Sequence, residues 1–123
     1  MAVRRRIDAA AGAAAVRAWQ HDPEDVARPV LATAVRYLLE ELSEAAEGNS
    51  VEVRVPPFGV TQCIPGPRHT RGTPPNVVEM TAQTWLGLAT GALSWAEAVG
   101  RAGTSASGTR ADLSDVLPLT RWG

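Results

Sequence analysis

Residues 51–55, VEVRV, alternate valine with charged side chains. In a strand, successive side chains point to opposite faces, so the valines would share one face while Glu52 and Arg54 share the other. Pro56 and Pro57 follow directly, and proline supplies no backbone N–H to a sheet. The pattern therefore predicts a half-buried strand that ends before the two prolines.

Two more short apolar runs follow, in residues 58–64 and 77–80. The first stops at the Pro-Gly-Pro of residues 65–67, and the second begins after the Pro-Pro-Asn of residues 74–76. Clusters of this kind mark turns and loops, so we expect two further strands separated by a polar loop. The small residues of 103–108, GTSASG, are compatible with a narrow strand at the edge of the same sheet.

A helical pattern fills residues 29–46. Its apolar side chains recur at steps of three and four residues, at Leu31, Ala34, Val35, Leu38 and Leu42. Pro29 suits the first helical position and Gly48 suits the end, while Asp22 before Pro23 predicts a short turn ahead of the helix. A solvated face of the helix, rather than a carboxylate site, is expected to carry Glu40, Glu41, Glu44 and Glu47.

Capping signals predict two helices after the third strand. Thr81 has the place of an N-cap, and Gly91 has the place of a C-terminal stop. Ser94 and Glu97 have the spacing of a capping box, in which each side chain accepts a hydrogen bond from the backbone N–H of the other residue. This spacing predicts a second, shorter helix that Gly100 ends.

The two ends of the chain carry weaker signals. Residues 1–16, MAVRRRIDAAAGAAAV, combine a basic start with small apolar residues, but Asp8 interrupts the run, which is too short to span a bilayer. We interpret them as an N-terminal helical extension that is frayed or partly disordered. Near the other end, Asp112 or Ser114 could begin a last helical segment that runs through Leu117.

Composition narrows the class of protein. The length of 123 residues predicts a single domain, 1–123. With 12 basic and 13 acidic residues the net charge is -1, which leaves no excess positive field for nucleic acid. Every basic residue is arginine, so a lysine Schiff base and a phosphate-loop lysine are excluded. The single cysteine, Cys63, forms no internal disulfide and suits a reducing, cytoplasmic compartment.

Candidate catalytic and metal-ligating groups are few. Cys63 and His69 could act as nucleophile and base, but a lone cysteine in a strand of a small domain is usually buried filler. His21, His69 and Cys63 lack any paired metal-ligand spacing. The GTSASG segment approaches a nucleophile elbow, but Ser107 stands where glycine is needed and no histidine follows it. We therefore expect no catalytic residue, no metal and no cofactor.

Two of the four tryptophans, Trp85 and Trp95, lie on the two adjacent predicted helices. Each can bury about 150–250 Å², which is worth roughly 4–6 kcal/mol at about 25 cal/mol per Å². Both are therefore expected to be covered. They either fill the core under the sheet or form the wall of an apolar cavity.

Several segments occur in a specific order along the chain: VEVRVPPFGVTQC, GPRHTRGTPPNVVE, TWLGLATG, SWAEAV and SASG, followed by ADLSDVLPL. This succession, preceded by the leucine-containing helix, resembles the bacterial, actinobacterial-type branch of the sterol carrier protein family over residues 17–119. The resemblance implies an α+β fold in which helices pack on one face of a curved sheet of about five strands, around an apolar tunnel.

Relatives bind sterols, fatty acids or acyl chains and perform no covalent chemistry, so the resemblance implies a lipid carrier rather than an enzyme. Carried over by position, the tunnel lining would be Val53, Val55, Phe58, Val60, Trp85, Leu88, Trp95 and Val99. The long N-terminal extension and the short C-terminal end depart from the family pattern.

Two questions stay open: what the polar loop binds, and whether the protein's own side chains fill the tunnel. Arg68, His69 and Arg71 could hold an acidic head group at the tunnel mouth, because arginine forks pair with carboxylates and phosphates. They could instead be structural and bind backbone carbonyls or Glu79. The runner-up function is an interaction or regulatory module that fills its tunnel with its own side chains and acts on an enzyme in trans or as a homodimer.

Overall fold

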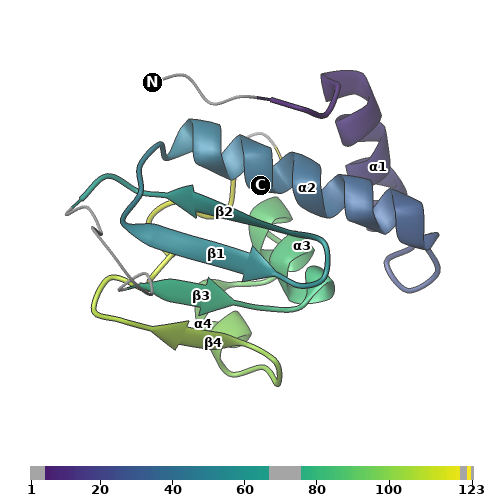
Figure 1. The fold of residues 1–123 in the computed structure, drawn as a ribbon. Coiled ribbons are helices and arrows are strands. Elements are labelled where there is room, and N and C mark those ends of the chain that lie inside the picture. The colour runs from purple at the N-terminus through teal and green to yellow at the C-terminus, as the bar shows by residue number, and fades with distance from the viewer. Residues whose placement is uncertain (1–4, 67–75, 120–121, 123) are drawn as a thin grey trace.

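A computed structural model describes residues 5–66, 76–119 and 122 of the protein. Its elements, in chain order, are α1 (Ala9–His21), α2 (Arg28–Ala45), β1 (Val51–Val55), β2 (Gly59–Cys63), β3 (Val77–Glu79), α3 (Ala82–Thr90), α4 (Trp95–Val99) and β4 (Ser105–Ser107). Figure 1 shows the strands as one layer with α3 behind it, and α2 running along the β2 side. The chain therefore has the α+β class that the sequence predicted.

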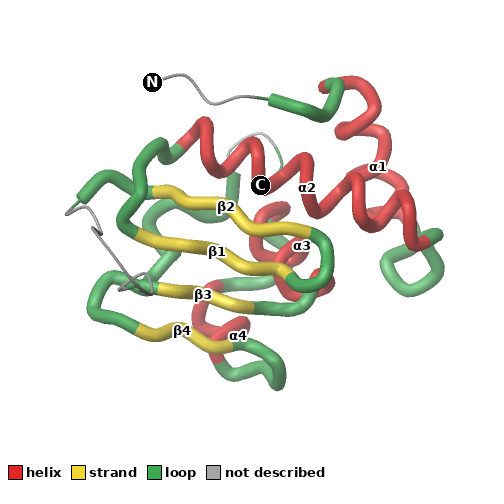
Figure 2. Tube along the Cα trace, viewed as in Figure 1, coloured by secondary structure: helices red, strands yellow, loops and turns green. Residues whose placement is uncertain are grey.

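The strands form one open sheet in the order β2-β1-β3-β4. The outer pairs, β1 with β2 and β3 with β4, are antiparallel, and the central pair of β1 and β3 is parallel. Figure 2 shows β4 at the edge, where the small residues of 103–108 predicted a narrow strand. The described residues contain four strands, against the five or so that the family resemblance implied.

The core lies between one face of the sheet and the helices. Val51, Val53 and Val55 are fully buried, while the intervening Glu52 and Arg54 are only partly buried and lie on the other face. This alternation follows from the period-two geometry of a strand. The α2 and α3 side chains that complete the core include Val35, Leu38, Leu42, Trp85 and Leu88.

Side-chain caps fix the ends of the helices after β3, as predicted. The Thr81 hydroxyl accepts the backbone N–H of Thr84, and Gly91 ends α3 in the left-handed region with a φ of 87°. Ser94 and Glu97 form the complete capping box that begins α4. Each of these contacts satisfies backbone groups that a helix terminus would otherwise leave unpaired.

The predicted helix near residue 117 is wrong, because the described chain forms only a turn there. The Asp112 carboxylate accepts the backbone N–H of Ser114, and the N–H groups of Val116 and Leu117 both donate to the Leu113 carbonyl. Aspartate favours such local turns, and proline at position 118 cannot continue a helix.

Helix α1 differs most from what the sequence indicated, because it runs to His21 and contributes to the core. Asp8, which interrupts the apolar run in the sequence, is its N-cap and accepts the backbone N–H of Ala11. Val16 is fully buried and Trp19 is 5% exposed. The Trp19 indole donates to the Gln83 side chain at 2.9 Å and so ties α1 to α3.

The close approach of α1 to α2 depends on Gly12. A Cβ at this position would lie 2.2 Å from the ring of Tyr37, which is itself fully buried in α2. Carbon atoms in contact normally lie about 3.5–4.0 Å apart, so only glycine fits at this separation. None of the helices formed by the described residues is long and apolar enough to cross a membrane.

Candidate ligand-binding site

Four of the side chains proposed to line a tunnel meet in the core. Val53 and Val55 of β1 are 0% exposed, as is Trp85 of α3, and Leu88 is 1% exposed. A side chain with no exposed surface adjoins no space that would admit a water-sized sphere. These four residues therefore pack against one another and their neighbours in the described structure, as they would in a filled core.

Trp85 has both an apolar and a polar role in this packing. Its ring is fully buried, and its indole Nε1 donates a hydrogen bond of 3.2 Å to the carbonyl oxygen of Val35 in α2. A buried indole N–H needs such a partner. The side chain therefore joins α3 to α2 within the same buried core that contains the β1 valines.

The other four lining candidates lie elsewhere. Val60 is directly opposite Arg54 in the sheet, so it shares the outer face and is 59% exposed. Phe58 is half-buried in the turn between β1 and β2, with the Arg28 guanidinium 5.1 Å from its ring centre. On α4, Trp95 is half-buried and Val99 is 45% exposed. Val60 and Val99 therefore lie on the surface, and Phe58 and Trp95 lie at the edge of the described core.

The three head-group candidates, Arg68, His69 and Arg71, lie outside the described residues. Cys63 is fully buried at the end of β2, and burial raises the pKa of its thiol to about 12. The thiol is therefore protonated at neutral pH, which is the behaviour of a core side chain rather than a nucleophile. Within the described ranges, no group of three or more histidine, cysteine, aspartate or glutamate side chains is placed to hold a metal ion.

A hollow of about 380 Å³ lies on the surface where the N-terminal arm, α2 and the β1–β2 hairpin meet. We call it the arm groove; its lining is Arg6, Ile7, Arg36, Leu39, Glu40, Phe58, Gly59, Val60 and Thr61. Arg36 joins two of its walls, because its Nε donates to the Phe58 carbonyl oxygen at 2.7 Å. No local pattern in the sequence predicts the arm groove, because its walls come from segments far apart in the chain.

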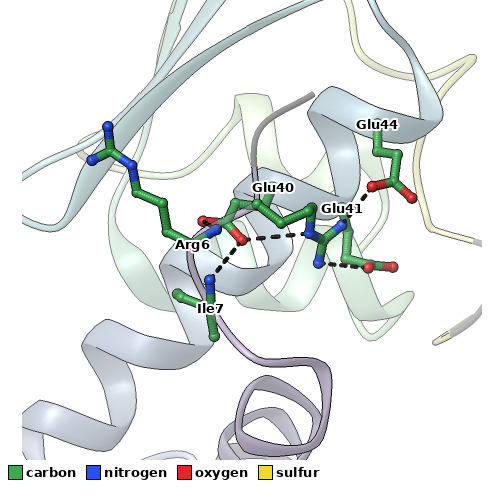
Figure 3. Close-up of polar contacts among 6 residues, drawn as sticks. Arg6, Ile7, Glu40, Glu41 and Glu44 are labelled. Atoms are coloured by element: carbon green, nitrogen blue, oxygen red, sulfur yellow. Dashed lines mark hydrogen bonds and ion pairs between the residues drawn. The ribbon is translucent and has the colours of Figure 1, made fainter. Parts of the chain in front are cut away.

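The arm, residues 5–7, is held to α2 by glutamates that the sequence placed on a solvated face. The Glu40 carboxylate accepts the backbone N–H groups of Arg6 and Ile7 at 3.1 and 3.2 Å (Figure 3). The Arg5 guanidinium forms ion pairs with Glu41 at 2.9 Å and with Glu44 at 3.2 Å. These contacts fix Ile7 as one wall of the arm groove.

The fold and this packing define a small α+β protein with helices on one face of an open sheet. The family described as bacterial SCP ortholog, where SCP denotes sterol carrier protein, matches residues 27–119. The chain belongs to this bacterial sterol carrier protein family. The match covers α2 and everything from there through β4, and leaves out the arm and α1. A comparison with curated proteins finds no match for the chain.

Proposed function

We propose that this protein is a non-catalytic carrier that binds an apolar ligand such as a sterol, a fatty acid or an acyl chain. The observation that carries the proposal is the family match over residues 27–119, which contain the whole sheet and the two helices bearing Trp85 and Trp95. The proposed internal site lies between β1 and α3, with Val53, Val55 and Leu88 beside Trp85. The single cysteine, Cys63, is free and so fits a reducing compartment such as the cytoplasm.

A closed core is the expected form of such a carrier without its ligand. An empty cavity of about 300 Å³ would cost about 7 kcal/mol at roughly 24 cal/mol per Å³. That cost is comparable to the whole stability of a domain, about 5–15 kcal/mol. Burial of each ligand methylene contributes about 0.8 kcal/mol, so a chain of about ten methylenes would offset the opening.

The test uses the full chain, purified gently and examined by native mass spectrometry for bound lipid. Thermal unfolding is then measured with and without added oleate, decanoate and cholesterol, because a ligand that binds only the folded state raises the melting temperature. We expect bound lipid or a raised melting temperature. Absence of both would refute the carrier proposal.

Tryptophan emission gives the location of the ligand. If the ligand enters beside Trp85, addition of lipid should change the emission of the parent protein. The Trp85→Phe variant should lose most of that change, whereas Trp122→Phe should keep it, because Trp122 is only half-buried, has the Arg17 guanidinium over its ring and is not one of the proposed lining residues. Equal responses of the two variants would contradict an internal site at Trp85.

A second candidate function is favoured by the absence of exposed surface on Val53, Val55 and Trp85. A core that stays filled would make the protein an interaction or regulatory module, acting on an enzyme in trans or as a homodimer. If the protein has this function, tryptophan emission should not change when lipid is added, and native mass spectrometry should show a dimer or a co-purified enzyme. A lipid-dependent change in emission, with a monomeric mass, would exclude it.

A further inference from the structure

The arm groove combines an apolar lining with guanidinium groups on its rim. Leu39 is 3% exposed, and Ile7 and Phe58 are half-buried. Val60 presents apolar surface, since it and Val99 are the exposed large hydrophobic side chains among the described residues. An acyl chain laid along these side chains would cover surface that now faces water.

Gly59 keeps the space open between the hairpin and α2. A Cβ at this position would lie 3.1 Å from Cδ1 of Leu39 and 3.7 Å from Cγ of Arg36. A methyl group there would therefore occupy part of the arm groove and press on its apolar floor. The volume of about 380 Å³ is within the range of roughly 300–1,000 Å³ that small-molecule sites occupy.

The charges around the arm groove favour an anion. Of its lining residues, Arg6 and Arg36 are cationic and only Glu40 is anionic. The Glu40 carboxylate is already bound by two backbone N–H groups and lies 3.5 Å from the Arg5 guanidinium. Its acceptor positions are thus already used inside the protein, and the lining of the arm groove carries one more positive than negative charge.

Both arginines on the rim have donors to spare. Arg36 uses Nε for the Phe58 carbonyl, and no described residue accepts a hydrogen bond from its two terminal nitrogens. The Arg6 side chain forms no ion pair with any described residue, and Figure 3 shows it extending away from Glu40, Glu41 and Glu44. Guanidinium groups in this state bind carboxylates through strong, charge-assisted hydrogen bonds.

We propose that the arm groove is a binding site for a single-chain anionic amphiphile, with the alkyl chain against Ile7, Leu39, Phe58 and Val60 and the carboxylate on Arg36 and Arg6. The inference deepens the proposed function, on which it rests for the expectation of an acyl ligand. It adds a site outside the core and selects a charged fatty-acid type of ligand over a neutral sterol.

The first experiment compares decanoate with decanol, which has the same chain and no charge. Each is titrated, below its micelle concentration, into the full-length protein at neutral pH while backbone amide NMR signals are followed. Decanoate should shift the signals of Ile7, Gly59 and Val60 and should bind at least about tenfold more tightly than decanol, which corresponds to about 1.4 kcal/mol. Equal affinity of the two probes would overturn the proposal.

Two strand variants with the same charge change test the location. Val60→Glu places a carboxylate in the arm groove, whereas Gln62→Glu places one two residues along β2, outside the lining. Both positions are exposed, so both variants should fold; across the sheet Val60→Glu faces Arg54 and Gln62→Glu faces Glu52, so the first should melt slightly higher than the second. Val60→Glu should weaken decanoate binding about tenfold or more, and Gln62→Glu should leave it within about twofold.

An arginine variant tests the head-group contact without disturbing the arm. Arg6→Gln removes the guanidinium and keeps the backbone N–H that Glu40 accepts. Its affinity for decanoate should fall while its affinity for decanol stays the same. If Arg6→Gln and Val60→Glu both bind decanoate as the parent does, the groove site is refuted.

The outcomes separate this inference from the carrier proposal. If decanoate binds but perturbs only Trp85 and its neighbours, the carrier proposal stands and the groove site is refuted. If neither decanoate nor any other lipid binds, both are refuted. If Gly59 and Val60 respond and the emission of Trp85 does not, the groove site stands without an internal one.

Discussion

Replacement of Gly12 by alanine tests the packing of α1 on α2 through the sign of its effect. In an exposed helix this substitution stabilises by about 1 kcal/mol, because alanine has the higher helix propensity. Here the new Cβ would lie 2.2 Å from the Tyr37 ring, so the ring or the helix must move by on the order of 1 Å to restore normal contact. Tyr37 has no exposed surface and no free space into which to move.

Overpacking of this kind costs about 1–3 kcal/mol, which exceeds the propensity gain over most of its range. We expect Gly12→Ala to lower the free energy of unfolding by about 1 kcal/mol, and the melting temperature by roughly 4 °C. Urea unfolding followed by circular dichroism measures the first quantity, and thermal unfolding measures the second. A variant that is as stable as the parent, or more stable, would refute the close contact between α1 and Tyr37.

A matched control exists at Gly100, the C-cap of α4. A Cβ there meets only the Glu97 carbonyl oxygen at an ordinary 3.6 Å, and the backbone has a φ of -86° that alanine adopts freely. Gly100→Ala should therefore be neutral or slightly stabilising. The cost of Gly12→Ala should also shrink in a Tyr37→Leu background, because the smaller side chain relieves the clash.

Three further predictions address single side chains. Because burial raises the pKa of Cys63 to about 12, the folded protein should resist iodoacetamide at neutral pH and react only when unfolded; rapid alkylation of the native state would show an accessible thiol. Glu40→Gln should accelerate amide hydrogen exchange at Ile7, because the Glu40 carboxylate accepts that N–H. Glu44→Gln should accelerate it less, and equal exchange rates in the two variants would contradict the anchoring role of Glu40. The backbone hydrogen bond from Ser94 lowers the pKa of Glu97 in the folded protein. The Glu97 carboxylate therefore stabilises α4 at neutral pH. This stabilisation begins to be lost as the pH falls below the unfolded-state pKa of about 4.3 and is gone below the lower pKa of the folded state. Glu97→Gln keeps an acceptor but cannot titrate, so amide exchange in α4 should depend less on pH there than in the parent; identical profiles would remove Glu97 as the cause.

Local signals in the sequence were sufficient to predict the strands and most helix ends. Strand β1 follows from the alternation of valine with charged residues, and its end follows from Pro56. Thr81 and Ser94 act as N-caps where their spacing predicted them, because a cap is decided by a few adjacent residues. The helices and strands could therefore be predicted from local signals, whereas their α+β arrangement was implied by the family resemblance.

Features that depend on register or on distant segments could not be predicted. The turn after β1 places Val60 opposite Arg54 and so on the outer face, while Thr61 pairs with Val53. No pattern in the sequence fixes that offset. The contribution of helix α1 to the core was underestimated, because its many alanines give no clear alternation of apolar and polar positions. Its burial also depends on contacts with Tyr37 and Gln83, which are distant in sequence.

The arm groove is a further example of this limit. Its walls come from the arm, α2 and the hairpin, and Glu40 contributes by binding backbone N–H groups that carry no side-chain signature. The candidate internal site was predicted only through the family resemblance. Its fully buried residues, Val53, Val55 and Trp85, carry the same hydrophobic signal whether a core is filled or hollow.

The family boundary at residue 27 is not a folding boundary, because α1 lies before it and still shields α2. A fragment trimmed to the shared segment would uncover the aromatic ring of Tyr37 and leave Gln83 without the indole partner it has in Trp19. Such a fragment would be prone to self-association through the uncovered helix. Comparative and engineering work on this protein should therefore treat the alanine-rich helix as an inseparable component of the domain.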